Sequence, residues 1–141
     1  MSNAKEYMMQ IQLYDTHITT KLEELRHLKE MVTRITPTLK DDVVSGGGSN
    51  SQDKLGDAVA KIVDIEDEIN RDIDFYVDAK QSISATLDQI TDPDQLQVLH
   101  KRYVQYKSWE QIACEMNMTY RNVCYIHGKA LQVVNEIMKG E

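Results

Sequence analysis

The sequence contains very little Phe, Trp and Pro. Among its 141 residues are one Phe, one Trp and two Pro. Large aromatic residues are enriched in strands, so their scarcity argues against an all-β fold. With a hydrophobic content of 41%, the chain is long enough for one compact domain or for a small domain with an extended helical arm.

The sequence also lacks signals for a membrane, a metal or a catalytic centre. No apolar run approaches the length of a membrane span and no signal peptide is recognisable, so a cytoplasmic location is expected. The two cysteines, Cys114 and Cys124, do not have metal-ligand spacing, and the four histidines are dispersed. No arrangement of residues suggests a catalytic triad. We therefore expect no metal, no cofactor and no enzymatic activity.

A helical repeat of apolar residues occupies the region from about Lys5 to Arg34. Steps of three and four residues, typical of a coiled-coil seam, connect Ile11, Tyr14, Ile18, Leu25, Leu28 and Val32, with Leu22 one place off. Pro37 is predicted to end this helix, because proline cannot donate the hydrogen bond that a helix interior requires. Residues 36–51, which include three consecutive glycines, are predicted to form a flexible linker.

A second long helix is predicted from about Gln52 to Ile90. Its heptad stepping is interrupted only at Glu66 and Lys80 and otherwise uses Leu55, Val59, Ile62, Ile69, Ile73, Tyr76, Ile83, Leu87 and Ile90. The two apolar stripes can pair as an antiparallel hairpin across the linker, or they can pair between chains. Residues 1–92 are thus expected to form a helical-hairpin arm that mediates self-association as a homodimer or another homo-oligomer.

Residues 93–141 have a different pattern, that of three short amphipathic helices. Asp92 and Pro93 suit the N-cap and first position of the first helix. Ser108 suits the N-cap of the second, and Thr119 that of the third. Asn117 lies in the turn between them, where a left-handed residue is needed. The second helix would bury Trp109, Ile112, Ala113 and Met116. This spacing predicts a helix-turn-helix, so the whole chain is expected to be all-α.

The third of these helices is predicted to have a core face and an outward face. The core face would contain Val123, Ile126, Ala130, Val133 or Val134, and Ile137. The outward residues of its first two turns would be Tyr120, Arg121, Asn122, Cys124 and Tyr125. Arg and Asn can make bidentate contacts with guanine and adenine, so this face is predicted to read DNA bases. A plain three-helix bundle with an accidental turn is the alternative that the pattern leaves open.

Three stretches of this region resemble region 4 of bacterial sigma factors, which reads the −35 promoter element. They are residues 98–103 (VLHKRY), residues 108–113 (SWEQIA) and residues 119–131, which close with Ile126-x-x-Lys129-Ala130-Leu131. The similarity covers roughly Leu96 to Val134. A long helical region joined to such a module resembles the small phage and prophage late-gene regulators of the RinA and ArpU type.

The resemblance implies roles for individual residues. Base contacts would fall at Tyr120, Arg121 and Tyr125, and Asn122 joins them as an outward residue of the same turn. Phosphate contacts would fall at Arg102, Ser108 and Thr119, with Lys107 and Lys129 as neighbouring candidates. Sigma factors usually carry an Arg-Glu-Arg run at residues 120–122 and an Arg at Cys124. This chain differs at those positions, so we expect it to recognise a different DNA sequence.

The net charge of −7 is distributed unevenly along the chain. Residues 1–92 contain 10 basic and 18 acidic residues, whereas residues 93–141 contain 6 and 5. A module with a net charge of +1 has few cations for phosphate, so one copy should bind DNA weakly and need a second module or RNA polymerase. We therefore expect a transcriptional regulator of a phage or prophage that binds double-stranded promoter DNA in the bacterial host cell. Two alternatives are a small terminase-like DNA-packaging subunit and a protein-only adaptor that docks on RNA polymerase.

Overall fold

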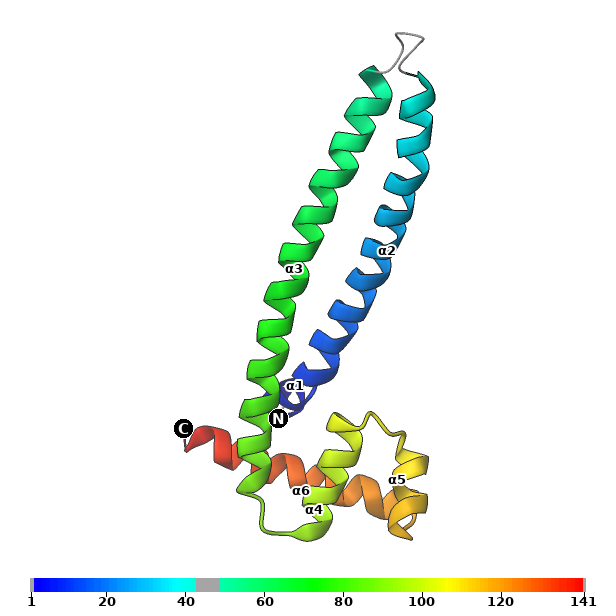
Figure 1. Ribbon diagram of the computed structural model, residues 1–141. Coiled ribbons are helices and arrows are strands. Elements are labelled where there is room, and N and C mark those ends of the chain that lie inside the picture. Colours follow the sequence, from blue (N-terminus) through cyan, green and yellow to red (C-terminus); the bar gives the residue numbers. More distant parts are fainter. Residues whose placement is uncertain (1, 43–48, 141) are drawn as a thin grey trace. The chain divides into compact units, whose positions relative to one another are not determined.

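The protein is all-α, as predicted (Figure 1). The computed structural model describes the backbone of residues 2–42 and 49–140 and the side chains of residues 3–35 and 53–140. Along the chain, the elements are α1 (Ser2–Met8), α2 (Gln10–Asp42), α3 (Ser49–Asp88), α4 (Pro93–Leu99), a π-helical turn η1 (His100–Val104), α5 (Trp109–Met116) and α6 (Tyr120–Lys139).

The chain divides into two compact units. Unit 1 contains residues 1–15 and 75–141, and unit 2 contains residues 16–74. This division differs from the predicted boundary at residues 92 and 93. The reason is that α1 and the C-terminal part of α3 share a hydrophobic core with α4 and α6, instead of belonging to a separate arm.

Unit 1 has a core to which residues far apart in the sequence contribute. Met8 of α1, Ile83 of α3, Leu99 of α4 and Val134 of α6 are all fully buried in one cluster. The hydroxyl group of Tyr7 lies 2.9 Å from that of Thr86, the buried polar residue of this unit. These contacts fix α1 and the end of α3 against the C-terminal helices, so the predicted three-helix module is part of a larger helical unit.

Unit 2 is an antiparallel hairpin in which α2 and α3 pair within one chain. Leu25 of α2 packs against Ile65 and Ile69 of α3. Leu22 lies one residue away from the seam of α2. The seam position itself is occupied by Lys21, whose Nζ is 2.7 Å from Oδ2 of Asp72. An ion pair therefore replaces one apolar layer of the hairpin.

From Leu55 to Lys80 the predicted seam is buried or half-buried at every second position and exposed at those between, whereas Ile83, Leu87 and Ile90 are all buried. Val59 and Ile73 were expected on a seam that pairs within the hairpin or between chains, and the hairpin leaves them 45% and 40% exposed. Glu66 and Lys80, which fall on the same seam, are also exposed. The buried or half-buried positions are one residue earlier, at Ala58, Ile65, Asp72 and Ala79. Ala58, Asp72 and Ala79 are small or polar and give little hydrophobic signal, so the pattern followed the larger side chains of Val59 and Ile73 instead.

The predicted linker is shorter than expected. Helix α2 continues through Pro37 to Asp42, and α3 begins at Ser49. A proline costs a helix one backbone hydrogen bond, but a long helix can continue past it. The remainder of the predicted linker, residues 43–48, lies outside the described residues.

Candidate nucleic-acid interface

The helix-turn-helix begins at α5, whose first turn is closed by a capping box. The Ser108 hydroxyl accepts a hydrogen bond from the Gln111 backbone N–H at 3.2 Å, and the Ser108 backbone N–H donates to the Gln111 side chain at 2.9 Å. Each contact satisfies a backbone donor that a helix start otherwise leaves without a partner. Ser108 therefore has the predicted N-cap position.

The turn between α5 and α6 depends on a left-handed residue, as predicted. Asn117 has φ 55° and ψ 45°, and the Met118 N–H donates to the carbonyl of Ala113 at 2.9 Å. The chain then enters α6 through Thr119, whose hydroxyl accepts a hydrogen bond from the Asn122 N–H at 3.0 Å. Caps on both sides of the turn thus fix where α5 ends and α6 begins.

A small apolar cluster holds α6 against α5. Val98, Ile112 and Val123 are fully buried in it. Further along α6, Ala130 and Val134 are fully buried in the main core of unit 1, whereas Val133 is half-buried. The predicted core face of the third helix is confirmed, and of the two alternatives Val133 and Val134 it is Val134 that is fully buried.

The predicted base-contacting residues are all exposed. Tyr120 and Tyr125 are 51% and 64% exposed, and Arg121 and Asn122 also face solvent. Arg121, Tyr125 and Lys129 follow one another at intervals of four residues and so lie along one side of α6. The ammonium group of Lys129 lies 5.6 Å from the centre of the Tyr125 ring. This side of α6 has a cation at each end and an aromatic ring between them.

Arg102 and Lys107, two predicted phosphate contacts, are engaged within the protein. The Arg102 guanidinium lies 4.3 Å from the centre of the Trp109 ring and donates to the Lys107 carbonyl at 3.0 Å. The Lys107 ammonium lies 2.7 and 2.8 Å from the two carboxylate oxygens of Glu115. The predicted phosphate contacts Ser108 and Thr119 serve as helix caps. Among the five, Lys129 is the cation whose side chain is exposed.

The pairing of Glu115 with two lysines was not predicted from the sequence. Lys101 Nζ also lies 2.7 Å from the Glu115 carboxylate, so two lysines from the start of the module converge on the end of α5. Their hydrogen bonds hold the pKa of the Glu115 carboxyl below its ordinary value. Lys101 and Glu115 are fourteen residues apart, and no local pattern links them.

A second missed feature is the aromatic cluster around His127. Its Nε2 lies 2.6 Å from the Tyr103 hydroxyl, and its ring meets the Trp109 ring edge-on at 4.5 Å between centres. Burial lowers the pKa of His127 to about 4, and the positive charges of Lys5 and Arg102 act in the same direction. At neutral pH the ring is therefore uncharged and serves packing rather than phosphate binding.

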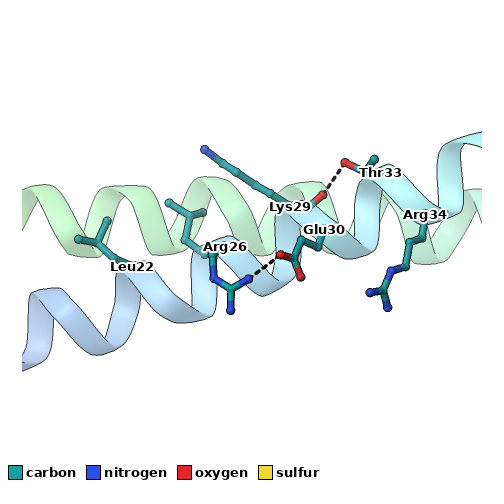
Figure 2. A pocket seen from close by; sticks show the side chains of 7 residues that line it. Leu22, Arg26, Lys29, Glu30, Thr33 and Arg34 are labelled. Carbon is teal, nitrogen blue, oxygen red and sulfur yellow. Dashed lines mark hydrogen bonds and ion pairs between the residues drawn. The ribbon is translucent and has the colours of Figure 1, made fainter.

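A groove in unit 2 has charged walls but does not make a convincing anion site. It is lined only by residues of α2, among them Arg26, Lys29 and Glu30 (Figure 2). Arg26 pairs with Glu23 and Glu30, and Lys29 lies 3.7 Å from Glu66. These cations are already neutralised by neighbouring carboxylates, so the exposed side of α6 is the stronger candidate.

The described residues form neither a metal site nor a membrane-spanning helix. In the part of the chain that the structure describes, no three His, Cys, Asp or Glu residues are placed so that they could hold a metal ion. None of the described helices combines the length and the apolar character that crossing a membrane requires.

Comparison with known proteins identifies a family for this chain. No curated protein and no solved structure matches the chain. Residues 32–135 match the family described as "Protein of unknown function (DUF1492)". The matched region begins within α2, contains all of α3, α4 and α5, and ends within α6. Because it covers 104 of the 141 residues, this chain belongs to the DUF1492 family.

Proposed function

We propose that this protein is a phage or prophage transcriptional regulator that binds promoter DNA through the α5–α6 helix-turn-helix and acts with RNA polymerase. The observation that carries the proposal is the exposed N-terminal part of α6, with Arg121, Asn122 and Tyr125 on a helix whose start is fixed by a capped turn. Side chains at this end of a recognition helix are the ones that reach base edges in the major groove.

The intramolecular ion pairs refine how the module would bind. Because Lys107 is paired with Glu115 and Arg102 is stacked on Trp109, the cations best placed for DNA are Arg121 and Lys129. Each phosphate contact contributes about −0.9 to the slope of log affinity against log salt concentration. With Lys129 as the exposed phosphate-contacting cation, one module should therefore show a shallow slope of about −1, and a slope at least twice as steep would indicate that two modules bind together.

The test is selection of random duplex DNA by the full chain at two salt concentrations, followed by affinity measurements on the enriched sequence. Replacing Arg121 with Ala should cost about 1–3 kcal/mol, roughly 5- to 150-fold in affinity, and relax specificity at one position. Arg71→Ala, which removes the same charge from the exposed surface of α3, is the matched control and should leave affinity nearly unchanged. Equal affinity of wild type and Arg121→Ala for every sequence would contradict the assignment of α6.

A second candidate function is docking on RNA polymerase without reading DNA. The exposed tyrosines Tyr120 and Tyr125 favour it, because large aromatic side chains are enriched in protein interfaces. If no DNA sequence is enriched at either salt concentration, while purified polymerase retains the wild type but not Tyr125→Ala, this function replaces the first.

A further inference from the structure

Helix α3 carries a second apolar stripe that is separate from its packing face. Val59, Val63, Ile73 and Val77 are 40–50% exposed, and they are four of the five exposed large apolar residues on this helix. At about 100° per residue, all four lie within roughly 80° of one another around the helix axis. Single exposed apolar residues are ordinary, but an aligned set along one face indicates a contact surface.

This stripe does not face α2. The residues of α3 that pack in the hairpin, Ile62, Ile65 and Ile69, are centred roughly 90° around the helix from it. No described residue of the chain buries the stripe, since all four of its side chains keep at least two fifths of their surface exposed. A helix with two apolar stripes is typical of bundles, in which it contacts two neighbours.

The spacing of the stripe identifies the second neighbour. The intervals between its residues are four, ten and four, so the pattern is the same in both directions along the helix. If two α3 helices pair in antiparallel fashion, Val59 meets Val77 of the second copy, and Val63 meets Ile73 of the second copy. Such self-complementarity is the requirement for an interface with two-fold symmetry, and an unrelated partner would impose no such symmetry.

The middle of the stripe fits the same register. Glu66 and Asn70 occupy the two remaining heptad positions, and the antiparallel register places Glu66 opposite Asn70 of the second copy. The Glu66 carboxylate is drawn aside toward Lys29, at 3.7 Å. Gly56, the next heptad position before Val59, has open space around it and would face the long side chain of Lys80. Polar layers of this kind weaken a helical interface but specify its register.

We propose that the stripe from Val59 to Val77 is a homodimer interface, in which the α3 helices of two copies pack antiparallel about a two-fold axis near residue 68. This interface is independent of what the exposed side of α6 binds. It also gives a reason for the four exposed apolar side chains, which would otherwise add apolar surface to water without benefit.

Cysteine cross-linking tests both the surface and the register. In a chain carrying Cys114→Ser and Cys124→Ser, the single variants Val63→Cys and Ile73→Cys are prepared separately, oxidised alone, and then oxidised as a mixture. The antiparallel register places residue 63 opposite residue 73, about 15 Å from its own counterpart. We therefore expect disulfide-linked dimers only in the mixture. Cross-linking of each variant alone would indicate parallel helices. If the mixture formed no disulfide-linked dimers, the stripe would not be a dimer interface. Either result overturns the proposal.

Analytical ultracentrifugation provides an independent test, because it measures the dimer dissociation constant of full-length variants. Two substitutions in the stripe should change this constant in opposite directions. Ile73→Asp should raise the dimer dissociation constant at least 10-fold, whereas Asn70→Leu should lower it by replacing a polar layer with an apolar one. Met31→Asp, which changes an apolar residue of similar exposure on α2, is the matched control and should leave the constant within about twofold. Circular dichroism of each variant verifies that the helices remain folded. An unchanged constant for Ile73→Asp and Asn70→Leu would overturn the proposal.

Discussion

The two units of this protein bury their apolar residues to different extents. In unit 1 many core residues are completely inaccessible to solvent, including Met8, Ile83 and Ile112. In unit 2 the buried residues Leu25, Ile65 and Ile69 retain 5–9% exposure, and further apolar residues lie in the open. Several helices that approach from different directions can enclose a core, whereas two helices side by side can bury only one stripe each. The difference teaches that several helices enclose the apolar core of unit 1, whereas the two-helix unit 2 leaves part of its apolar surface exposed.

The largest expected effect comes from matched truncations in the two units. Ile112→Ala removes a fully buried side chain and should lower the free energy of unfolding by about 2–5 kcal/mol. Ile69→Ala removes the same atoms from the hairpin, where the cavity opens to solvent, and should cost about 2 kcal/mol or less. Urea unfolding followed by circular dichroism measures both, at a protein concentration below that of dimer formation. Equal losses would show that the hairpin core is as complete as that of unit 1.

Acid should weaken unit 1 through His127. Its pKa is lowered to about 4 in the folded protein, chiefly by burial, from an ordinary value of 6.5. Between these two pH values the unfolded chain binds more protons, so stability falls as the pH is lowered from about 6.5 to about 4. Because the ring is only partly buried, solvent screening reduces the loss to about 1–2 kcal/mol.

The measurement is the free energy of unfolding at pH 7 and at pH 5 for wild type and His127→Phe. The variant keeps an aromatic ring against Trp109 but cannot be protonated. Its stability should therefore decrease less than that of the wild type over this interval. If the two proteins lose the same stability, His127 is not the residue that makes unit 1 sensitive to acid.

The sequence was informative wherever neighbouring residues determine the structure. Asp92, Ser108 and Thr119 cap the helices as predicted, and Asn117 has the predicted left-handed conformation. Each of these features depends on hydrogen bonds within a few residues, so local residue types are sufficient to predict it. The same holds for the exposure of Arg121 and its neighbours, which follows from the helical period once the core face is known.

Features that depend on tertiary approach were not predictable. The Glu115 carboxylate meets Lys101 and Lys107 only because η1 and α5 fold toward each other, and Arg102 reaches the Trp109 ring for the same reason. These contacts involve three of the module's cations, so sequence alone overestimated the charge available for phosphate. The packing of α1 against α6 was missed as well, because nothing in either segment specifies its partner.

The smallest expected effect concerns the turn that orients α6. Asn117 has a positive φ of 55°, a conformation that costs an ordinary L-residue roughly 1–2 kcal/mol but is open to Gly. Asn117→Ala should therefore lower the free energy of unfolding by about 1 kcal/mol, and Asn117→Gly should change it by only a few tenths. Thermal unfolding of both variants measures this difference. If Asn117→Ala and Asn117→Gly have equal stability, the left-handed conformation of residue 117 does not contribute to the stability of unit 1. The two units would then differ only in how much apolar surface they enclose.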